Sequence, residues 1–406
     1  MINNPYLNTH YNFTIVGAGA SGLWLANAMM DHGLLNNKTL RIVENDNNKT
    51  NDRTWCFWAK EGIKEPEIVS KEWRLIKDLY RKRNNQIFPY RYYHIKSNHF
   101  YDHLKEKLKQ NPNIYWHIDT VNTVEHISQN KIKIETENHA WESDYVFLSA
   151  LPLKNKTQQL EKLNHYLGKK NNQNKELFLW QSFVGYRIKT EQPAFNPAEL
   201  IMMDFNADQS NATQFFYELP FSEHEALVEF TRFGTDVIDY NYAIKQIEGR
   251  LKAKNINYQI LETEKGAIPM TPQFDINKPS LNSSQKIIYI GTLGGAIKPT
   301  TGYGFKRMFH YAEKLAEALK SERETTLPTM KRKWRFKVYD IILLQILIES
   351  PHLGKTIFQT LFTNQPITRI LKFLDEDTSI LEEVKIFARL PLIPFIKSLF
   401  KFVLTK

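Results

Sequence analysis

Cysteine is almost absent from this chain of 406 residues, which contains only Cys56. A single thiol excludes an intrachain disulfide framework and any metal site built from several cysteines. No base stands beside Cys56 in the sequence, so we expect a small packed residue rather than a nucleophile. The 12 histidines form no H-x-x-H or H-E-x-x-H pattern, and we therefore predict no metal site.

Long apolar runs and a secretory signal are also missing. The longest candidate, residues 341–348, is interrupted by Gln345 and falls far short of the roughly 20 residues that span a bilayer. Residues 1–11 lack a basic segment followed by an apolar one. We therefore expect a cytoplasmic protein, either soluble or attached peripherally to the inner face of the membrane.

The formal net charge of +10 comes without any nucleic-acid recognition motif, so no nucleic-acid partner is expected. Apolar residues make up 42% of the chain and aromatic residues 13%, which excludes a disordered protein. The length predicts two or three domains, each with its own core.

The first 45 residues carry the signature of a dinucleotide-binding βαβ unit. Residues 12–16 are predicted to form a buried strand, 23–30 a helix and 39–43 a second strand. Between the first two lies a G-x-G-x-x-G loop in which Gly17 permits the turn, Gly19 lets a pyrophosphate approach and Gly22 lets the helix pack closely. The helix N-terminus, near Ser21, offers N–H groups to phosphates.

Glu44 follows Gly22 by 22 residues, where an acidic side chain can bind a ribose hydroxyl. An acid at this position favours FAD or NAD over NADP. Arg53, in the following loop, is either a contact to phosphate or adenine or a surface arginine.

A second glycine-rich junction stands far downstream. Residues 287–290 read as a buried strand that runs into Gly291 and Gly295, and residues 305–320 read as a helix. Such a junction is expected when a discontinuous domain holds a flavin nucleotide at both ends, and an ordinary tight turn is the alternative. The loop between them contains Pro299, Thr300, Thr301 and Gly302.

The fold class expected from this order is α/β, with a discontinuous Rossmann-type FAD-binding domain. Its two parts are predicted at 1–156, including a returning strand at 144–150, and at 285–322. A substrate domain built on an antiparallel sheet is predicted between them at 157–284, with strands at 177–188, 200–205, 214–219 and 226–233 and a polar loop at 154–175. A helical, membrane-associating region is predicted at 323–406.

The last region contains a basic run at 331–335 and an apolar stripe at its end. Leu392, Phe395, Ile396, Leu399 and Val403 fall on one helical face, opposite two lysines. A helix of this kind suits a membrane interface, or it packs on the protein's own core.

Nine motifs, in this order, make the sequence similar to the bacterial FAD-dependent lycopene β-cyclases, which are related to the plant enzymes. The resemblance extends over nearly the whole chain. The motifs lie at 17–22, 52–58, 180–185, 202–205, 216–222, 228–231, 265–269, 298–303 and 335–340.

The resemblance implies cyclisation of the linear ψ end groups of lycopene to β-rings, with reduced FAD and with NAD(P)H as reductant. The family's functional glutamate corresponds to Glu229, while the acidic residue expected next is replaced by Phe230. In this reaction an acid protonates C2, the C5=C6 double bond attacks the cation at C1, and C6 loses a proton. Asp204 is the second candidate catalytic residue; it supports the flavin or Glu229, or it only ends a strand.

The residues around Glu229 are expected to form a dry pocket. Apolar neighbours at 227, 228, 230 and 233 should raise the pKa of this carboxyl, and aromatic faces stabilise cations. The candidates for such faces are Phe230, Phe215, Phe216, Tyr217 and Trp55.

Other functions remain open at this point. A flavin-dependent monooxygenase or a prenyl reductase acting on an isoprenoid lipid would need net electron flow. A flavin-containing lipid-binding or regulatory protein would show no turnover, and a basic nucleic-acid binder would be retained on DNA in a salt-dependent manner.

Overall fold

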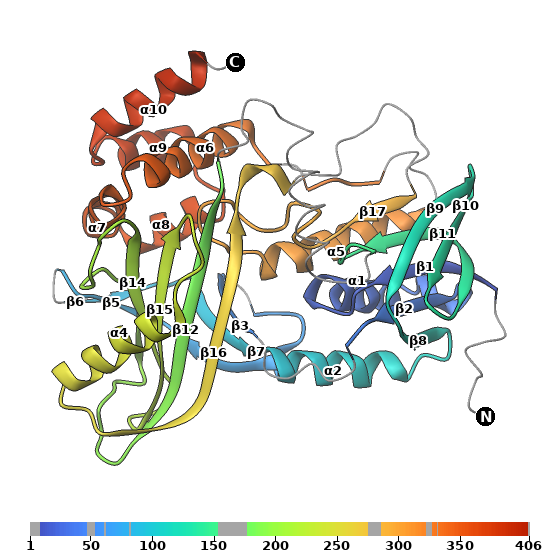
Figure 1. Cartoon of the computed structure of the whole chain (residues 1–406), viewed down its shortest axis with the longest axis horizontal. Helices are drawn as coiled ribbons and strands as arrows, with labels where there is room; N and C mark the ends of the chain where they lie inside the picture. Colours follow the sequence, from blue (N-terminus) through green and yellow to red (C-terminus); the bar gives the residue numbers. More distant parts are fainter. Residues whose placement is uncertain are drawn as a thin grey trace.

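The computed structural model describes residues 9–46, 53–60, 62–80, 83–152, 177–274, 286–321, 327–330 and 332–404. Figure 1 shows a nucleotide-type sheet with its helices at one end, a long antiparallel sheet at the other, and a layer of helices that carries the C-terminus. The expected polar loop at 154–175 lies outside the described residues.

The first sheet has the strand order β8-β2-β1-β11-β10-β9, with β17 beside β11. Its central strands are parallel, and β9, β10 and β11 form antiparallel pairs. The predicted returning strand is β11, which pairs with β1. The bounds are β1 His10–Val16, β2 Leu40–Glu44, β8 Ile114–Ile118, β9 Val121–Ser128, β10 Lys131–Thr136, β11 Ala140–Leu148 and β17 Ile287–Tyr289.

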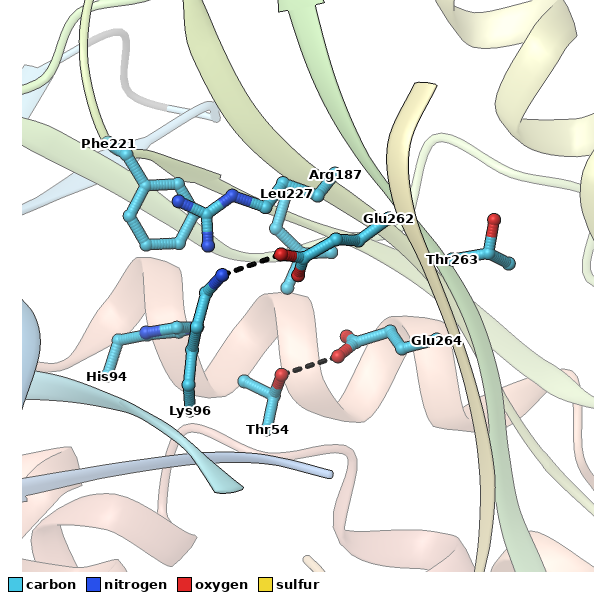
Figure 2. Close-up of a pocket in the computed structure, with 9 residues that line it drawn as sticks. All are labelled: Thr54, His94, Lys96, Arg187, Phe221, Leu227, Glu262, Thr263 and Glu264. Carbon is cyan, nitrogen blue, oxygen red and sulfur yellow. Dashed lines mark hydrogen bonds and ion pairs between the residues drawn. The ribbon is translucent and has the colours of Figure 1, made fainter. Parts of the chain in front are cut away.

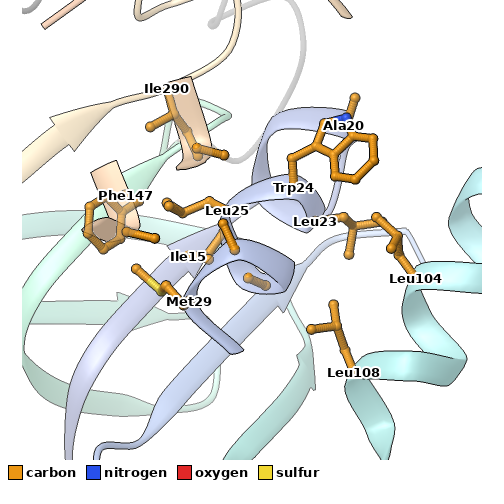
Figure 3. Close-up of a cluster of buried hydrophobic side chains, with 14 of the residues drawn as sticks. Ile15, Ala20, Leu23, Trp24, Leu25, Met29, Leu104, Leu108, Phe147 and Ile290 are labelled. Atoms are coloured by element: carbon orange, nitrogen blue, oxygen red, sulfur yellow. The ribbon is translucent and has the colours of Figure 1, made fainter. Parts of the chain in front are cut away.

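Three helices pack with this sheet: α1 Ala20–Asp31, α2 Ser97–Lys109 and α5 Phe305–Ser321. Figure 3 shows α1 between the sheet and α2, with its Leu and Met side chains directed to both. The Trp24 ring makes edge contacts with Phe100, Phe305 and Phe309, so α1, α2 and α5 share one core. This packing holds the glycine loop at the N-terminus of α1.

The second sheet has the order β16-β12-β15-β14-β13-β5-β6. The bounds are β5 Leu75–Asp78, β6 Arg83–Gln86, β12 Leu179–Thr190, β13 Glu199–Asp204, β14 Thr213–Pro220, β15 Glu225–Gly234 and β16 Tyr258–Met270. The four strands predicted at 177–233 are β12 to β15. The sheet also takes β5 and β6 from the segment predicted as the first nucleotide-binding part, because β13 pairs in parallel with β5.

The two faces of the second sheet meet different elements. Helix α4 (Tyr240–Ala253), capped by Asp239, covers one face with an apolar cluster. On the other face lies a small sheet of order β3-β7-β4, with β3 Thr54–Ala59, β7 Arg91–Lys96 and β4 Val69–Trp73. The space between the second sheet and β3 contains the candidate site.

The C-terminal region is helical, as predicted. It consists of α6 Trp334–Glu349, α7 Leu353–Asn364, α8 Ile367–Leu374, α9 Ile380–Phe387 and α10 Leu392–Leu404. Helix α7 packs on β14, and Gly354 comes so close that a Cβ there would lie 1.9 Å from Thr213 Oγ1. Among the described residues, no helix combines the length and the apolar character needed to cross a membrane.

Candidate functional site

The first glycine loop has the geometry of a phosphate cradle. Gly17 has a φ of +95°, which favours glycine, and a Cβ on Gly22 would lie 2.1 Å from the Gly17 carbonyl oxygen. Gly19 stands before α1 with no side-chain cap, and a Cβ there would meet open space. The N-terminus of α1 is therefore open to an anion, and the loop fits a dinucleotide pyrophosphate.

Glu44 lies at the end of β2, against this loop. Its Oε2 accepts a hydrogen bond from the Ala18 N–H at 2.6 Å, and its Oε1 accepts one from the Asn45 N–H at 3.0 Å. The structure thus brings Glu44 together with the glycines, as the spacing predicts. Arg53 is exposed just before β3, and its backbone N–H donates to Ser97 Oγ at 3.1 Å.

The second glycine-rich junction returns to the first. Gly291 has a φ of +64°, and a Cβ there would lie 2.5 Å from Ser21 Oγ on α1. Ser21 Oγ is also 2.8 Å from Ser149 Oγ, at the end of β11. Gly295, with a φ of +81°, continues this loop toward α5. Residues 270 positions apart in the sequence therefore form one surface at the N-terminus of α1.

The loop at 298–304 is fixed by a buried ionic cluster. Lys298 Nζ lies 3.2 Å from Glu376 Oε1, and Arg332 binds both Glu376 and Asp340. Thr300 Oγ1 donates to Asp340 Oδ1 at 2.6 Å, which joins two of the sequence motifs. Burial alone would raise the pKa of Glu376, but Lys298 and Arg332 lower it to about 2. Thr300 therefore anchors the loop with its hydroxyl.

The same loop then reaches the second sheet. Gly302 has a φ of +70°, and a Cβ there would lie 2.5 Å from Gln181 Oε1 on β12. Among the described residues, Thr301 Oγ1 and Gln181 Oε1 are buried without a hydrogen-bond partner. Buried polar atoms normally have a hydrogen-bond partner, and the polar edge of a flavin ring would supply one to each of these two atoms. Together with the dinucleotide cradle, they make the site fit FAD.

A cavity of about 110 Å³ adjoins this loop. It is smaller than the roughly 300–1,000 Å³ of sites that enclose a whole ligand, so it suits one end of a long molecule. The loop after Thr300 supplies one wall and the second sheet another. The lining residues are Thr54, Trp55, Cys56, Tyr92, Gln181, Phe183, Tyr217, Leu219, Leu227, Glu229, Ile268, Thr301, Gly302, Tyr303, Gly304 and Phe305.

Neutral hydroxyl and thiol groups dominate the polar part of this cavity. Burial raises the pKa of Tyr303 to about 12 and raises the pKa of Tyr217 and Tyr92 well above the usual range. Burial, followed by the nearby carboxyls Glu229 and Glu264, raises the pKa of the Cys56 thiol. Cys56 is thus a neutral thiol, in agreement with its predicted role as a packed residue.

Glu229 extends from β15 into this cavity, as the sequence suggests. Thr231 Oγ1 donates a hydrogen bond to Glu229 Oε1 at 2.6 Å. Burial raises the pKa of Glu229 well above its ordinary value, and the neighbouring carboxyl Glu264 raises it further. The physical cause expected from the sequence, desolvation, is therefore present, together with a second carboxyl that the sequence analysis did not identify.

Glu264 of β16 is that second carboxyl. Burial raises its pKa, while hydrogen bonds from Thr54 and Glu229 lower it. Glu229 and Glu264 pair with the same residue, Gly185 of β12, from its two sides. The only sequence signal was position: Glu264 immediately precedes the motif at 265–269.

Glu264 also faces a second, polar cavity of about 280 Å³ that shares Thr54 and Leu227 with the first. Figure 2 shows Lys96 directed to Glu262, at 2.7 Å, and Thr54 directed to Glu264. Burial lowers the pKa of His94 in its wall to about 3, so this imidazole is neutral.

Three aromatic predictions (Phe215, Phe216 and Phe230) and one carboxylate prediction (Asp204) need correction. Strand alternation directs Phe230 and Phe216 away from the cavity into the cluster beneath α4, so neither forms a wall around Glu229. Asp204 pairs with Phe216 and lies on that same α4 face, where Arg250 Nη1 binds its Oδ2 at 2.6 Å. Asp204 is thus a buried ion-pair partner at the end of β13, on the opposite face of the sheet from Glu229.

Of the five aromatic candidates, two lie in the cavity wall. Trp55 and Tyr217 line the cavity, as predicted. Phe215 is buried in the core between the second sheet and α7, in edge contact with Tyr217. Tyr92, Phe183, Tyr303 and Phe305 also line the cavity. Phe183 and Tyr303 lie within the motifs at 180–185 and 298–303, whereas no motif contains Tyr92.

Outside the cavity, His117, Asp119 and His139 come together at the end of the first sheet, a grouping that no sequence spacing indicated. Burial and the nearby Arg41 lower the pKa of His117. The positive charge of Arg41 opposes a cation at this position, and we assign the group no function.

Comparisons with known proteins show which family and which fold this chain resembles. A lycopene beta-cyclase from Paracoccus sp. (strain N81106 / MBIC 01143) is 29% identical over 149 residues, which are 34% of this chain and 35% of that protein. The match thus spans about a third of that relative's length.

Two solved structures share the fold. A geranylgeranyl bacteriochlorophyll reductase-like protein from Thermoplasma acidophilum has a TM-score of 0.57 at 13% identity, covering 97% of this chain and 99% of that one. The p-nitrophenol 4-monooxygenase PnpA from Pseudomonas putida DLL-E4 has a TM-score of 0.52 at 14% identity, covering 98% of both chains. The predicted fold class is confirmed: the chain shares with these structures an α/β architecture that has a parallel nucleotide-type sheet, a second sheet domain and C-terminal helices.

The family model described as "Lycopene cyclase protein" matches residues 12–400. Because this match extends from β1 to α10, it includes the glycine loops, the second sheet with Glu229 and the C-terminal helices. The chain belongs to the lycopene cyclase family.

Proposed function

We propose that this protein is a lycopene β-cyclase, which closes the linear ψ end groups of lycopene to β-rings by way of γ-carotene to β-carotene. The observation that carries the proposal is the position of Glu229. Its carboxyl has a strongly raised pKa and lies in a small aromatic cavity beside the loop that fits a flavin. Such a group is a Brønsted acid at neutral pH.

The proposed reaction begins with the proton of Glu229. This proton passes to C2 of the end group, and C1 becomes cationic. The electron pair of C5=C6 then forms the C1–C6 bond, and C5 becomes cationic. Loss of the C6 proton to the Glu229 carboxylate restores the double bond and the acid. The sum is an isomerisation that consumes neither reductant nor water.

The cavity walls contribute in two further ways. Trp55, Tyr217 and Tyr303 present aromatic faces, each of which stabilises a cation by about 0.5–2 kcal/mol. Leu219 and Leu227 exclude water that would otherwise capture the cation or solvate the carboxylate. The cavity is therefore suited to a short-lived carbocation.

The proposed cofactor is FAD in its reduced form, with NAD(P)H as the reductant. Gly17, Gly19, Ser21 and Glu44 would hold its nucleotide end. Gly291 and Gly295 would lie beside the pyrophosphate bound by the first loop, and the loop from Pro299 through Thr301 and Gly302 would meet the flavin ring. When bound there, reduced FAD would supply negative charge next to the cavity.

The direct test is expression in a bacterial host that accumulates lycopene. We expect the pigment to shift to β-carotene, identified by liquid chromatography. Persistent lycopene in cells that contain soluble, flavin-loaded protein would contradict the proposal.

A second test separates acid catalysis from redox catalysis. In D₂O, each ring closed should carry one deuterium at C2, because the added proton comes from an exchangeable carboxyl. A reductant should be needed to prepare the flavin but should not be consumed in proportion to product. Stoichiometric NAD(P)H oxidation would instead favour the monooxygenase or prenyl reductase alternative.

We also propose a peripheral membrane contact through the C-terminal helices. Apolar side chains are exposed on α9 and α10, up to 75% for Leu381 and 83% for Leu404. We name this set the α9–α10 apolar surface. It consists of Ile380, Leu381, Val384, Leu392, Ile393, Ile396, Leu399, Phe400, Val403 and Leu404.

The opposite side of α10 packs on the protein. Ser398 Oγ lies 2.8 Å from Gln345 Oε1 of α6, and Phe395 packs against the core of the helical layer. Tyr217 and Tyr303 of the cavity contact this same core. Lys397 on α10 would add attraction to anionic lipid of about 1 kcal/mol, whereas Lys401 is paired with Glu349 of α6. This arrangement favours a site at the inner face of the cell membrane, where a lipophilic carotene resides.

Vesicle flotation tests the membrane proposal. We expect binding to anionic vesicles that decreases in the double variant Ile393→Ser/Phe400→Ser. The matched control is Ile260→Ser/Leu261→Ser, which removes exposed apolar side chains from β16 and should leave binding unchanged. Equal flotation of the two variants would contradict the assignment of this surface.

A further inference from the structure

Two carboxyls meet over one glycine at the centre of the second sheet. Gly185 of β12 pairs with Glu229 of β15 on one side and with Glu264 of β16 on the other. Adjacent strands lie about 4.8 Å apart, so side chains on β15 and β16 are normally separated by one from β12. Because position 185 has no side chain, the two glutamates can reach one another.

The contacts at Gly185 show that Glu264 occupies this gap. A Cβ on Gly185 would lie 3.0 Å from Glu264 Cγ, 3.1 Å from Glu264 Oε1 and 3.1 Å from Leu227 Cδ1. The Glu264 side chain therefore lies over the glycine, and each of the two carboxyls influences the pKa of the other.

A hydrogen bond between two carboxyls requires one proton. Thr231 donates to Glu229 Oε1, and Thr54 donates to Glu264 Oε2. Among the described residues, no donor reaches the buried Oε1 atom of Glu264. A proton held by Glu229 satisfies that atom, whereas two ionised carboxylates would repel one another.

The groups facing the pair do not replace this proton. On the Glu264 side, Arg187 binds Glu225 and Lys96 binds Glu262, so both cations already have a carboxylate partner. On the Glu229 side lie the neutral hydroxyls of Tyr217 and Tyr303 and the Cys56 thiol.

This environment is asymmetric. The Thr54 hydroxyl donates to Glu264 and favours its anion, and Arg187 acts in the same direction, although the charge of Glu262 opposes it. Among the residues that the structure describes, Thr231 is the one hydroxyl donor to Glu229, which lies among aromatic rings. The charge of the pair is therefore stabilised on Glu264 and the proton on Glu229.

We propose that Glu229 and Glu264 share one proton across Gly185, and that Glu264 is the positioning residue that keeps this proton on Glu229. The inference rests on the proposed cyclase function, in which Glu229 is the acid. It also supplies a paired carboxylate from β16, where the family's motif has an acid at the position of Phe230. Glu264 itself transfers no proton to the substrate.

The test is Glu264→Gln in the full-length, flavin-loaded protein. Glutamine keeps the shape but removes the charge, and its amide N–H₂ would stabilise the Glu229 anion. The limb of the pH–activity profile where activity falls with rising pH should move down by roughly 1–3 pH units. The control Glu262→Gln removes a charge from the same strand at an exposed position and should move this limb far less.

A second readout does not depend on turnover. The carbonyl stretch of a protonated carboxylic acid, followed by infrared spectroscopy across pH, should disappear in Glu229→Gln and titrate at lower pH in Glu264→Gln. Flavin content and thermal unfolding verify that each variant is folded. If band and activity profile are both unchanged in Glu264→Gln, or if the band itself is lost there, the inference is wrong.

The outcomes separate the two proposals. If the band moves as expected but no variant or wild type cyclises lycopene, the carboxyl pair stands and the cyclase proposal fails. If lycopene is cyclised but Glu264→Gln moves neither band nor profile, the cyclase proposal stands and the shared proton is rejected. A lowered rate without any change in the pH profile would assign Glu264 a structural role only.

Discussion

The two faces of the second sheet both contain carboxyl groups, which are buried on the α4 face and half-buried on the cavity face, and the surroundings of these groups differ. On the α4 face, Asp204 binds Arg250 at 2.6 Å, and Glu218 binds Lys254 and Arg250. On the cavity face, Glu229 and Glu264 contact one another and two threonine hydroxyls. A carboxylate with a cation beside it holds the fold together. A carboxyl whose nearest ionisable neighbour is another carboxyl retains a proton and is available for chemistry.

The largest expected effect is on the cavity face. Glu229→Gln removes the proposed acid, and cyclisation should fall by about 10²–10⁴-fold, the usual contribution of a general acid. Flavin content should not change, because Glu229 lies outside the glycine loops. Product analysis of the purified variant with matched flavin loading checks this. Activity near the wild-type value would remove Glu229 from the mechanism.

The same variant also has a predicted effect on stability. The folded state of the wild type binds the Glu229 proton more tightly than the unfolded state, so its stability falls as pH rises from about 4.5 toward the raised pKa. Glu229→Gln does not titrate there and should gain stability relative to wild type across that range. Denaturant unfolding at several pH values measures the difference. A constant difference would contradict the raised pKa.

Phe230→Asp would restore the acid expected from the family motif, but on the wrong face. Phe230 is fully buried beneath α4, with its ring centroid 4.8 Å from that of Phe216. Loss of this ring lowers the free energy of unfolding by about 3–5 kcal/mol, and a buried carboxyl without a hydrogen-bond or ion-pair partner lowers it further. We expect reduced yield and stability with no gain in rate. The control Phe230→Leu should retain most activity. Faster cyclisation in Phe230→Asp would show that this face contributes to catalysis.

Arg250→Met tests the opposite face directly. It leaves Asp204 without its cation, and breaking a buried pair costs about 3–5 kcal/mol. Adding Asp204→Leu should recover much of that loss, because apolar replacement of both partners is often neutral. The pH profile of cyclisation should not move in either variant. A shifted profile, or inactive but stable Asp204→Asn protein, would return Asp204 to the catalytic set.

Local patterns were sufficient for one half of the site and insufficient for the other. The cradle formed by Gly17, Gly22 and Glu44 follows from a strand, a turn and a helix adjacent in sequence, and each has the predicted place. Glu264 and Asp204 depend on strand order and register instead. A shift of one residue would exchange the faces of Asp204, and no periodicity within β16 reveals that Glu264 meets Glu229 across β12. The pairing of β5 with β13 was missed for the same reason.

The smallest substitution addresses the gap itself. Gly185→Ala adds one methyl group where Glu264 Cγ and Oε1 lie 3.0 and 3.1 Å away, so the Glu264 side chain must move. The backbone at 185 belongs to regular strand β12, and alanine there should change stability by about 1 kcal/mol or less. The pH profile should nevertheless move in the same direction as in Glu264→Gln, because the carboxyls are separated.

Gly266→Ala is an unsuitable comparison, since its Cβ would lie 2.5 Å from the Phe183 ring. Gly249→Ala on α4, where a Cβ meets open space, is the matched control and should leave the profile in place. If Gly185→Ala is folded and has the pH profile of the wild type, the contact of the two carboxyls over this glycine does not determine the pKa of Glu229.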